Sequence, residues 1–118
     1  MTVTDGDDLT IRLPSAAVIA ERELSSFDED GRESIVRVEI EAPRQAEPPD
    51  EVLWACRFRI TTVEGSSWVT ITGIDGFDAV AKAFNVIAIH LRAFADRSNR
   101  RLLWFGDADF GFPLNPRS

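Results

Sequence analysis

Side chains on which most enzyme chemistry depends are scarce in this sequence: its 118 residues include one histidine, one cysteine and no tyrosine. Any Ser/His/Asp or Cys/His catalytic arrangement would therefore need His90. The lone Cys56 excludes an intramolecular disulfide and a cysteine metal cluster. The chain also lacks a phosphate-binding loop, a dinucleotide-binding glycine pattern and zinc-ligand spacing, so we expect no cofactor and no metal.

Long apolar runs are missing as well. No segment approaches the roughly 18 apolar residues that can cross a membrane. The N-terminal sequence, MTVTDGDDLT, has neither the cationic start nor the apolar stretch of a secretory signal. We therefore expect a cytoplasmic protein of bacterial type that has no membrane partner.

Basic side chains are outnumbered, because 20 acidic residues against 13 lysines and arginines give a net charge of −7. Nucleic-acid binding needs a basic surface that displaces counterions, so we do not expect a nucleic-acid partner. The acidic balance favours solubility and, where the protein has a partner, a basic one.

The composition is that of a globular protein, with 44% apolar and 28% charged residues, and the length suits one domain. Residues 1–15 are polar and predict a mobile arm or a loosely added edge strand. Residues 16–118 predict a single domain, in which apolar and polar residues alternate as in half-buried strands. The predicted strands cover residues 18–24, 33–41, 52–61, 68–72 and 102–105, and a proline-rich loop covers 43–50.

Residues 76–96 carry the clearest periodic pattern, that of an amphipathic helix capped by Asp75. The stripe expected to face the sheet consists of Phe77, Val80, Ala81, Phe84, Ala88, Leu91 and Ala95. Further apolar residues beyond this stripe, such as Ile89 and Ala93, predict a second layer, formed by residues 102–112 or by another copy. The expected fold is α+β: an antiparallel meander sheet of about four to five strands with one helix packed on one face.

Charged residues alternate along the predicted outer face of the sheet. Arg57 and Arg59 on one strand are expected beside a charged row on its neighbour. That row consists of Arg37, Glu39 and Glu41. One interpretation is a solvated ladder of cross-strand ion pairs, each worth roughly 0.2–1 kcal/mol. The alternative is a binding surface in which Trp68 and Ile19 are apolar anchors and the two arginines hold an anionic ligand.

The C-terminal segment holds a second group of candidate partner or ligand contacts. Trp104, Asp107 and Asp109 are close in sequence and lie next to Gly106 and Gly111. Paired carboxylates can bind a cation or act as acid and base. We prefer the alternative, in which they shape a turn while neighbouring aromatic residues pack under the helix, because loops need turn chemistry whatever their function.

Neither of the single reactive side chains is predicted to be catalytic. Cys56 is expected to face the core between Trp54 and Phe58, where a thiol acts as a small apolar group. His90 lies in the predicted helix beside the apolar stripe, and we interpret it as a structural or interface histidine.

Three short motifs resemble a known family. The closing pattern Leu102-x-Trp104-x-Gly106-x-x-Asp109-x-Gly111-Phe112-Pro113 is similar to the closing motif of a family of small bacterial domains of unknown function. The other two motifs are Glu21-Arg22-Glu23-Leu24 and Gly73-x-Asp75-Gly76-Phe77-Asp78-Ala79-Val80. The resemblance covers residues 18–113. It implies an α+β domain, and it implies no activity and no catalytic residues.

Three functions follow from these features. We favour a small non-enzymatic interaction domain that binds a protein partner or associates with itself. The first alternative, motivated by the net charge, is an immunity-type acidic inhibitor of a basic toxin. The second is a small hydrolase or ligand-binding enzyme that uses Asp107, Asp109, Arg57 or His90. The lack of a nucleophile–base pair counts against this second alternative.

Overall fold

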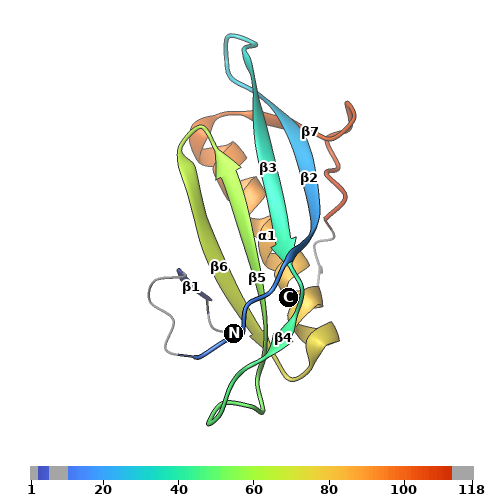
Figure 1. The fold of residues 1–118 in the computed structure, drawn as a ribbon. Helices are drawn as coiled ribbons and strands as arrows, with labels where there is room; N and C mark the ends of the chain where they lie inside the picture. The colour runs from blue at the N-terminus through green and yellow to red at the C-terminus, as the bar shows by residue number, and fades with distance from the viewer. Residues whose placement is uncertain (1–2, 6–10, 113–118) are drawn as a thin grey trace.

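A computed structural model describes residues 3–5 and 11–112 of the chain. In these residues a long helix lies against one face of a twisted antiparallel sheet (Figure 1). The elements in chain order are β1 Val3–Asp5, β2 Val18–Phe27, β3 Glu33–Glu41, β4 Arg44–Gln45, β5 Trp54–Thr62, β6 Gly65–Gly73, α1 Gly76–Ser98 and β7 Arg101–Leu103. Among the described residues no helix combines the length and apolar character needed to cross a membrane.

The four long strands of the sheet form a meander. After the last of them, α1 leads to a further strand at the opposite edge of the sheet. Its strand order is β1-β6-β5-β3-β2-β7, and β4 pairs with β5 beside this path. The long strands β2, β3, β5 and β6 are neighbours in the order in which the chain makes them. From β6, α1 carries the chain back across the sheet, so that β7 pairs with β2. This arrangement confirms the predicted α+β fold.

Short strands account for most differences from the predicted sheet. Val3–Asp5 of the N-terminal arm pairs with β6, which agrees with the edge-strand alternative, and the rest of the arm up to residue 10 lies outside the described residues. Strand β4 lies within the predicted proline-rich loop. Strand β7 ends at Leu103 instead of residue 105, because the chain then makes a tight turn in which Phe105 and Gly106 have φ values of 50° and 79°.

The core lies between the sheet and α1. Val36, Val38 and Ile40 of β3 are buried, as are Cys56 and Phe58 of β5. These residues belong to the faces that the two-residue alternation predicted to be inward. Burying a large apolar side chain contributes about 1.5–3 kcal/mol, so the alternating pattern selects one face of the sheet for the helix.

The ends of α1 follow from local hydrogen bonding. The Asp75 carboxylate accepts a hydrogen bond from the backbone N of Asp78 (2.7 Å), which confirms the predicted cap. In return, the Asp78 carboxylate accepts one from the backbone N of Ile74 (2.9 Å). The helix continues to Ser98, slightly beyond the predicted end, and stops where Asn99 adopts a left-handed conformation (φ 52°).

The face of α1 that meets the sheet differs from the predicted stripe. Phe77 was expected to face the sheet but is 90% exposed, and Ala81 is exposed as well. The buried residues of α1 are Ala79, Ala83, Val86, Ile87, Ala88, Leu91 and Phe94. Three residues of the predicted stripe are only partly buried and pack against the margin of the core: Val80, Phe84 and Ala95. The prediction was wrong here because apolar residues cover a wide arc of α1, and spacing alone does not locate its centre.

The side of α1 that faces the sheet is determined by a close approach between Gly73, at the end of β6, and the first turns of α1. A Cβ atom on Gly73 would lie 2.6 Å from the backbone N of Ala79 and 2.8 Å from a carboxylate oxygen of Asp78. No side chain fits in that space. The strand and the helix therefore meet through a glycine and a small alanine.

A second layer forms beside α1 from the C-terminal segment, one of the two arrangements predicted. Phe112 packs against Phe84 with 6.2 Å between ring centroids, and Phe110 is buried in the core. Arg22 of β2 holds the segment in place. Its guanidinium lies 3.8 Å from the centroid of the Trp104 ring, and its Nη1 donates to the carbonyl oxygen of Phe110 (2.9 Å).

Replacing Gly73 by alanine is expected to destabilise the fold by about 1–3 kcal/mol, because the added methyl group collides with the backbone of α1. Urea unfolding followed by tryptophan fluorescence measures the loss. Gly76→Ala is the matched control: its Cβ would meet the Trp54 ring at an ordinary 3.5 Å, and alanine favours the helix. An equal loss in both variants would contradict the role assigned to Gly73.

Candidate functional site

The outer face of the sheet carries a ladder of ion pairs, as one of the two sequence interpretations predicted. Glu39 lies opposite Arg59, whose Nη2 and Nε atoms are 2.8 and 2.9 Å from its Oε1. On the neighbouring pair of strands, Arg37 Nη2 lies 2.7 Å from Glu23 Oε2. The guanidinium of Arg59 therefore already has a carboxylate partner within the sheet.

Trp68 lies beside both arginines that were predicted with it as ligand contacts. The guanidinium carbons of Arg57 and Arg59 are each 4.7 Å from the centroid of the Trp68 ring. Such cation–π contacts contribute about 0.5–1 kcal/mol at exposed sites. Ile19, the other expected anchor, lies on β2, which β3 and β5 separate from β6. The structure thus groups Arg57, Arg59 and Trp68 without Ile19.

Arg57 also belongs to a charged group with Glu41, beside which it was expected, and with Arg44, which the sequence did not indicate. Arg44 Nη1 donates to Glu41 Oε1 (2.9 Å), and Arg57 Nε lies 4.0 Å from the same oxygen. Arg44 and Glu41 are both buried. A cavity of about 410 Å³ adjoins the group, and residues 11 and 13–16 line its other side. Arg44 was placed in an irregular loop, so no alternation pattern could reveal its orientation.

The C-terminal carboxylates shape a turn. The Asp107 carboxylate accepts a hydrogen bond from the backbone N of Asp109 (3.0 Å), and the Asp109 carboxylate accepts one from the backbone N of Gly111 (2.9 Å). Trp104 and Asp107 close the preceding turn through two backbone hydrogen bonds. In residues 3–5 and 11–112 no group of three potential metal ligands occurs. This turn follows β7 and so lies far across the sheet from Trp68.

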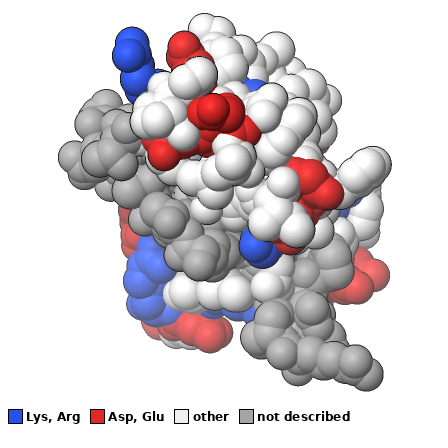
Figure 2. Space-filling model, turned by 90° about the horizontal axis from the view of Figure 1, so that it is seen from below, with Lys and Arg blue, Asp and Glu red and all other residues white. Residues whose placement is uncertain are grey.

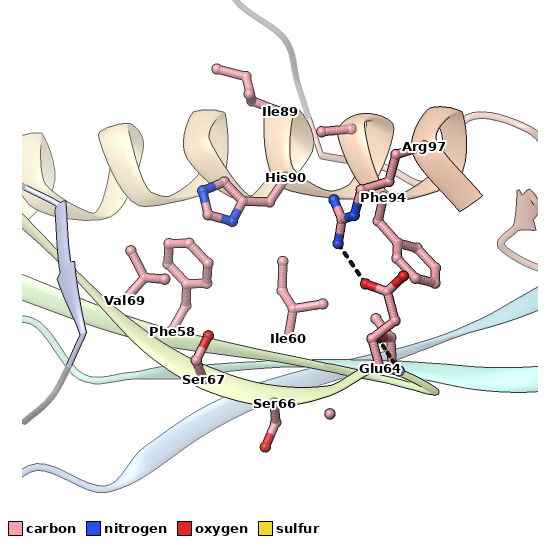
Figure 3. A pocket seen from close by; sticks show the side chains of 13 residues that line it. Phe58, Ile60, Glu64, Ser66, Ser67, Val69, Ile89, His90, Phe94 and Arg97 are labelled. Atoms are coloured by element: carbon pink, nitrogen blue, oxygen red, sulfur yellow. Dashed lines mark hydrogen bonds and ion pairs between the residues drawn. The ribbon is translucent and has the colours of Figure 1, made fainter. Parts of the chain in front are cut away.

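A cleft of about 520 Å³ lies between the β5–β6 hairpin and the C-terminal half of α1 (Figure 3). Its apolar lining consists of Phe58, Ile60, Val69, Ile89, Ala93 and Phe94. At one end Arg97 of α1 pairs with Glu64 of the hairpin turn (2.8 Å). No residue pattern predicted this cleft. The one feature of the sequence that could have indicated it is the apolar character of Ile89 and Ala93, which lie outside the predicted stripe of the helix.

His90 points from α1 into this cleft (Figure 3). Its ring meets Phe58 edge to face, with 5.8 Å between centroids. Partial burial, with a smaller contribution from the Arg97 guanidinium, lowers the pKa of His90 below its ordinary value, so the imidazole is neutral at pH 7. Within the described part of the chain no carboxylate hydrogen-bonds to His90, so a pair that would activate a nucleophile or base is absent there.

The outer edge of β6 is paired over only part of its length by the described residues. β1 pairs with β6 only at Val69–Ile71, so the N-terminal half of β6 has no second strand partner among the described residues. Gly65 pairs with Thr62 across a two-residue turn. Alternation along the strand then directs the backbone N–H and C=O groups of Ser66 and Trp68 outward, away from β5.

Apolar and acidic side chains share the end of the molecule where β4 and the start of α1 meet. Val52, Ile74 and Phe77 are 78%, 79% and 90% exposed. The pairing of Trp54 with Gly73 places their two loops at the same end of the sheet. The acidic residues of these loops are Glu47, Asp50, Glu51 and Asp75. Figure 2 looks onto this end and shows uncharged surface with both acidic and basic groups, next to parts of the chain that are not described.

Cys56 is enclosed in the core, as predicted. Its Sγ atom lies 3.6 Å from the carbonyl oxygen of Glu41. Burial raises the pKa of the Cys56 thiol from 9.0 to about 11, so the reactive thiolate is scarce at neutral pH.

The Cys56 thiol is expected to make stability depend on pH in a narrow window. Well below pH 9 both the folded and the unfolded state keep the thiol proton, and the contribution to stability is complete. It is lost as the pH rises toward about 11, by up to roughly 2–3 kcal/mol. The sequence has no tyrosine and one lysine, so few other groups titrate there. Urea unfolding at about pH 8 and 10.5 measures the loss. In Cys56→Ala the free energy of unfolding should fall much less between these two pH values. An equal fall in that variant would contradict the assignment to Cys56.

Comparison with known proteins identifies a family. No match to this chain was found among curated proteins or among solved structures. A family described as a domain of unknown function (DUF6968) matches residues 20–114, a span that runs from β2 to the C-terminal turn. The expectation of an uncharacterised domain family is confirmed, and the chain belongs to this family of domains of unknown function, DUF6968.

Proposed function

We propose that this domain is a non-enzymatic interaction module that binds an extended segment of another protein along the outer edge of β6. The observation that carries the proposal is the position of β1. It occupies this edge at Val69–Ile71 and leaves the half beside the cleft without a strand partner in the described residues. An edge that accepts one strand of the chain has the geometry to accept another.

Addition of a strand to a sheet edge is a common mode of peptide recognition, in which main-chain hydrogen bonds give affinity and alternate side chains give specificity. The outward backbone groups of Ser66 and Trp68 supply the donors and acceptors. Ser67 points toward α1 and Ser66 points away from it (Figure 3). Every second side chain of an added strand would therefore enter the cleft, and the others would pass Trp68 on the outer face.

The lining of the cleft favours an apolar side chain. Phe58 and Ile60 form its floor, and the neutral His90 adds a polar group without charge. The Glu64–Arg97 ion pair closes one end and contributes no net charge. We therefore expect a partner segment in which an apolar residue faces α1.

The polar candidates elsewhere support binding more than catalysis. Arg59 is paired with Glu39, and the carboxylates of Asp107 and Asp109 accept backbone hydrogen bonds in a turn. Each of these groups has a structural partner. No nucleophile is held against a base in the described residues, which is the arrangement that a hydrolase of the predicted type would use.

A random peptide library displayed on phage tests the proposal. Selected peptides should carry an apolar residue, and N-methylation at alternate positions should weaken binding by at least about tenfold, because it removes main-chain donors. Ala93→Arg, which places a long charged side chain in the cleft, should abolish binding. Ala81→Arg is the matched control on an exposed part of α1 outside the cleft. Equal binding by both variants, or no selection above background, would overturn the proposal.

Self-association is the version of this proposal in which the partner is a second copy. Two β6 edges would then pair with each other. Light scattering distinguishes the versions: a dimer that Ala93→Arg converts to a monomer identifies a second copy, and a strict monomer leaves a different protein as the partner.

The apolar and acidic end of the molecule favours a second candidate, the immunity-type inhibitor of a basic toxin. Val52, Ile74 and Phe77 offer an apolar centre, and the surrounding carboxylates complement a basic partner. Complementary charge of this kind raises association rates and fixes orientation.

For this second candidate, binding to the basic product of a neighbouring gene should weaken as salt rises, because salt screens exposed charges. Phe77→Arg should reduce the affinity by at least about tenfold, since it removes the central apolar contact and adds a like charge to the partner. Isothermal titration calorimetry measures both effects. Binding that Phe77→Arg and Ala81→Arg leave equally strong would exclude this end of the molecule.

A further inference from the structure

A cavity lies on the face of the sheet opposite α1, away from the β6 cleft. Residues 11–16 cross this face ahead of β2 (Figure 1) and, except for Arg12, line one side of a space of about 410 Å³. Backbone hydrogen bonds hold this segment in place: Glu47 N donates to Arg12 O (2.7 Å), and Ala42 N donates to Ala17 O (3.0 Å). The other side carries the side chains of Glu41, Arg44 and Arg57.

Among the described residues that line this space, positive charge is in excess. Arg44 is 8% exposed and Glu41 is 9% exposed, and the side chain of Arg57 is 21% exposed. Two guanidinium groups therefore share one carboxylate. A buried charge without a partner costs several kcal/mol, so a surplus guanidinium in such a place favours a bound anion.

Unpaired donors point to the same place. The Nε atoms of Arg44 and Arg57 are buried and have no hydrogen-bond partner in the structure of the described residues. The third such buried atom is the hydroxyl of Thr70, which lies opposite Arg57 in the β5–β6 register. Buried donors left unpaired cost about 1–3 kcal/mol each, and two of these three atoms belong to the arginines that line the cavity.

We propose that Arg44 and Arg57 form a binding site for an oxyanion, a carboxylate or phosphate group of a small ligand, in the cavity beside residues 11–16. A guanidinium presents its donors in a planar fork that matches the oxygens of either group. Glu41 orients Arg44 from one side, and the buried Nε atoms of both arginines have no hydrogen-bond partner in the described structure. From the sequence we expected Arg57 and Arg59 to hold an anion together; the cavity is lined by Arg57 and Arg44, and Arg59 does not reach it.

This site is independent of the proposed peptide-binding edge. Arg59 is on the same strand as Arg57, but it does not line the cavity, and its guanidinium is paired with Glu39. It therefore provides a matched control for any general effect of positive charge on this face of the sheet.

The test follows the Nε–Hε resonances of the arginine side chains by NMR during titration with inorganic phosphate and, separately, with succinate, at constant ionic strength. The resonances of Arg44 and Arg57 should shift and saturate, and that of Arg59 should stay in place. A response to phosphate alone assigns a phosphate ligand, and a response to succinate alone assigns a carboxylate. Unchanged Arg44 and Arg57 resonances at about 50 mM of both probes would overturn the proposal.

Two substitutions complete the test. Arg57→Gln keeps the buried Glu41–Arg44 pair, so the variant should fold, and it should weaken the binding of the responding anion by at least about tenfold. Arg59→Gln should leave that binding unchanged. An equal loss in the two variants would mean that the anion is attracted by the general charge of the surface, and the site would be rejected.

Discussion

The close approach of β6 and α1 at Gly73 is the contact on which the other parts of this structure depend. A glycine in the strand and small alanines in the helix let the two backbones nearly touch. Because α1 starts directly after β6, this contact fixes both where the helix begins on the sheet and which of its faces turns inward. The core then fills with the residues that this orientation selects, from Ala79 to Phe94.

That placement divides the inner face of the sheet into two unequal parts. On the β2 side, the apolar flank of α1 is covered by the C-terminal segment, where Phe84 meets Phe112 and Arg22 stacks on Trp104. On the β6 side the flank stays open and becomes the cleft that contains His90. One helix with a wide apolar arc thus packs against the C-terminal segment on one side and lines a cleft on the other.

The outer face of the sheet follows a different principle, since its polar side chains are satisfied by one another. Arg59 and Arg37 form ion pairs with carboxylates on neighbouring strands. Each such pair contributes little to the stability of the fold, because water remains close. The exception is the group around Arg57, beside which residues 11–16 lie. An unpaired donor that is removed from water costs more free energy than an exposed one. The group around Arg57 is therefore the candidate ligand site on this face of the sheet.

Several features of this protein were determined by the sequence alone, because they depend on neighbours within a few residues. The alternation of β3, the Asp75 cap and the grouping of Arg57, Arg59 and Trp68 follow from local periodicity and short connections. Tertiary structure decided the exposure of Phe77, the burial of Arg44 and the existence of the cleft. Each of these depends on how closely segments distant in sequence approach one another, and residue spacing within one segment does not contain that distance.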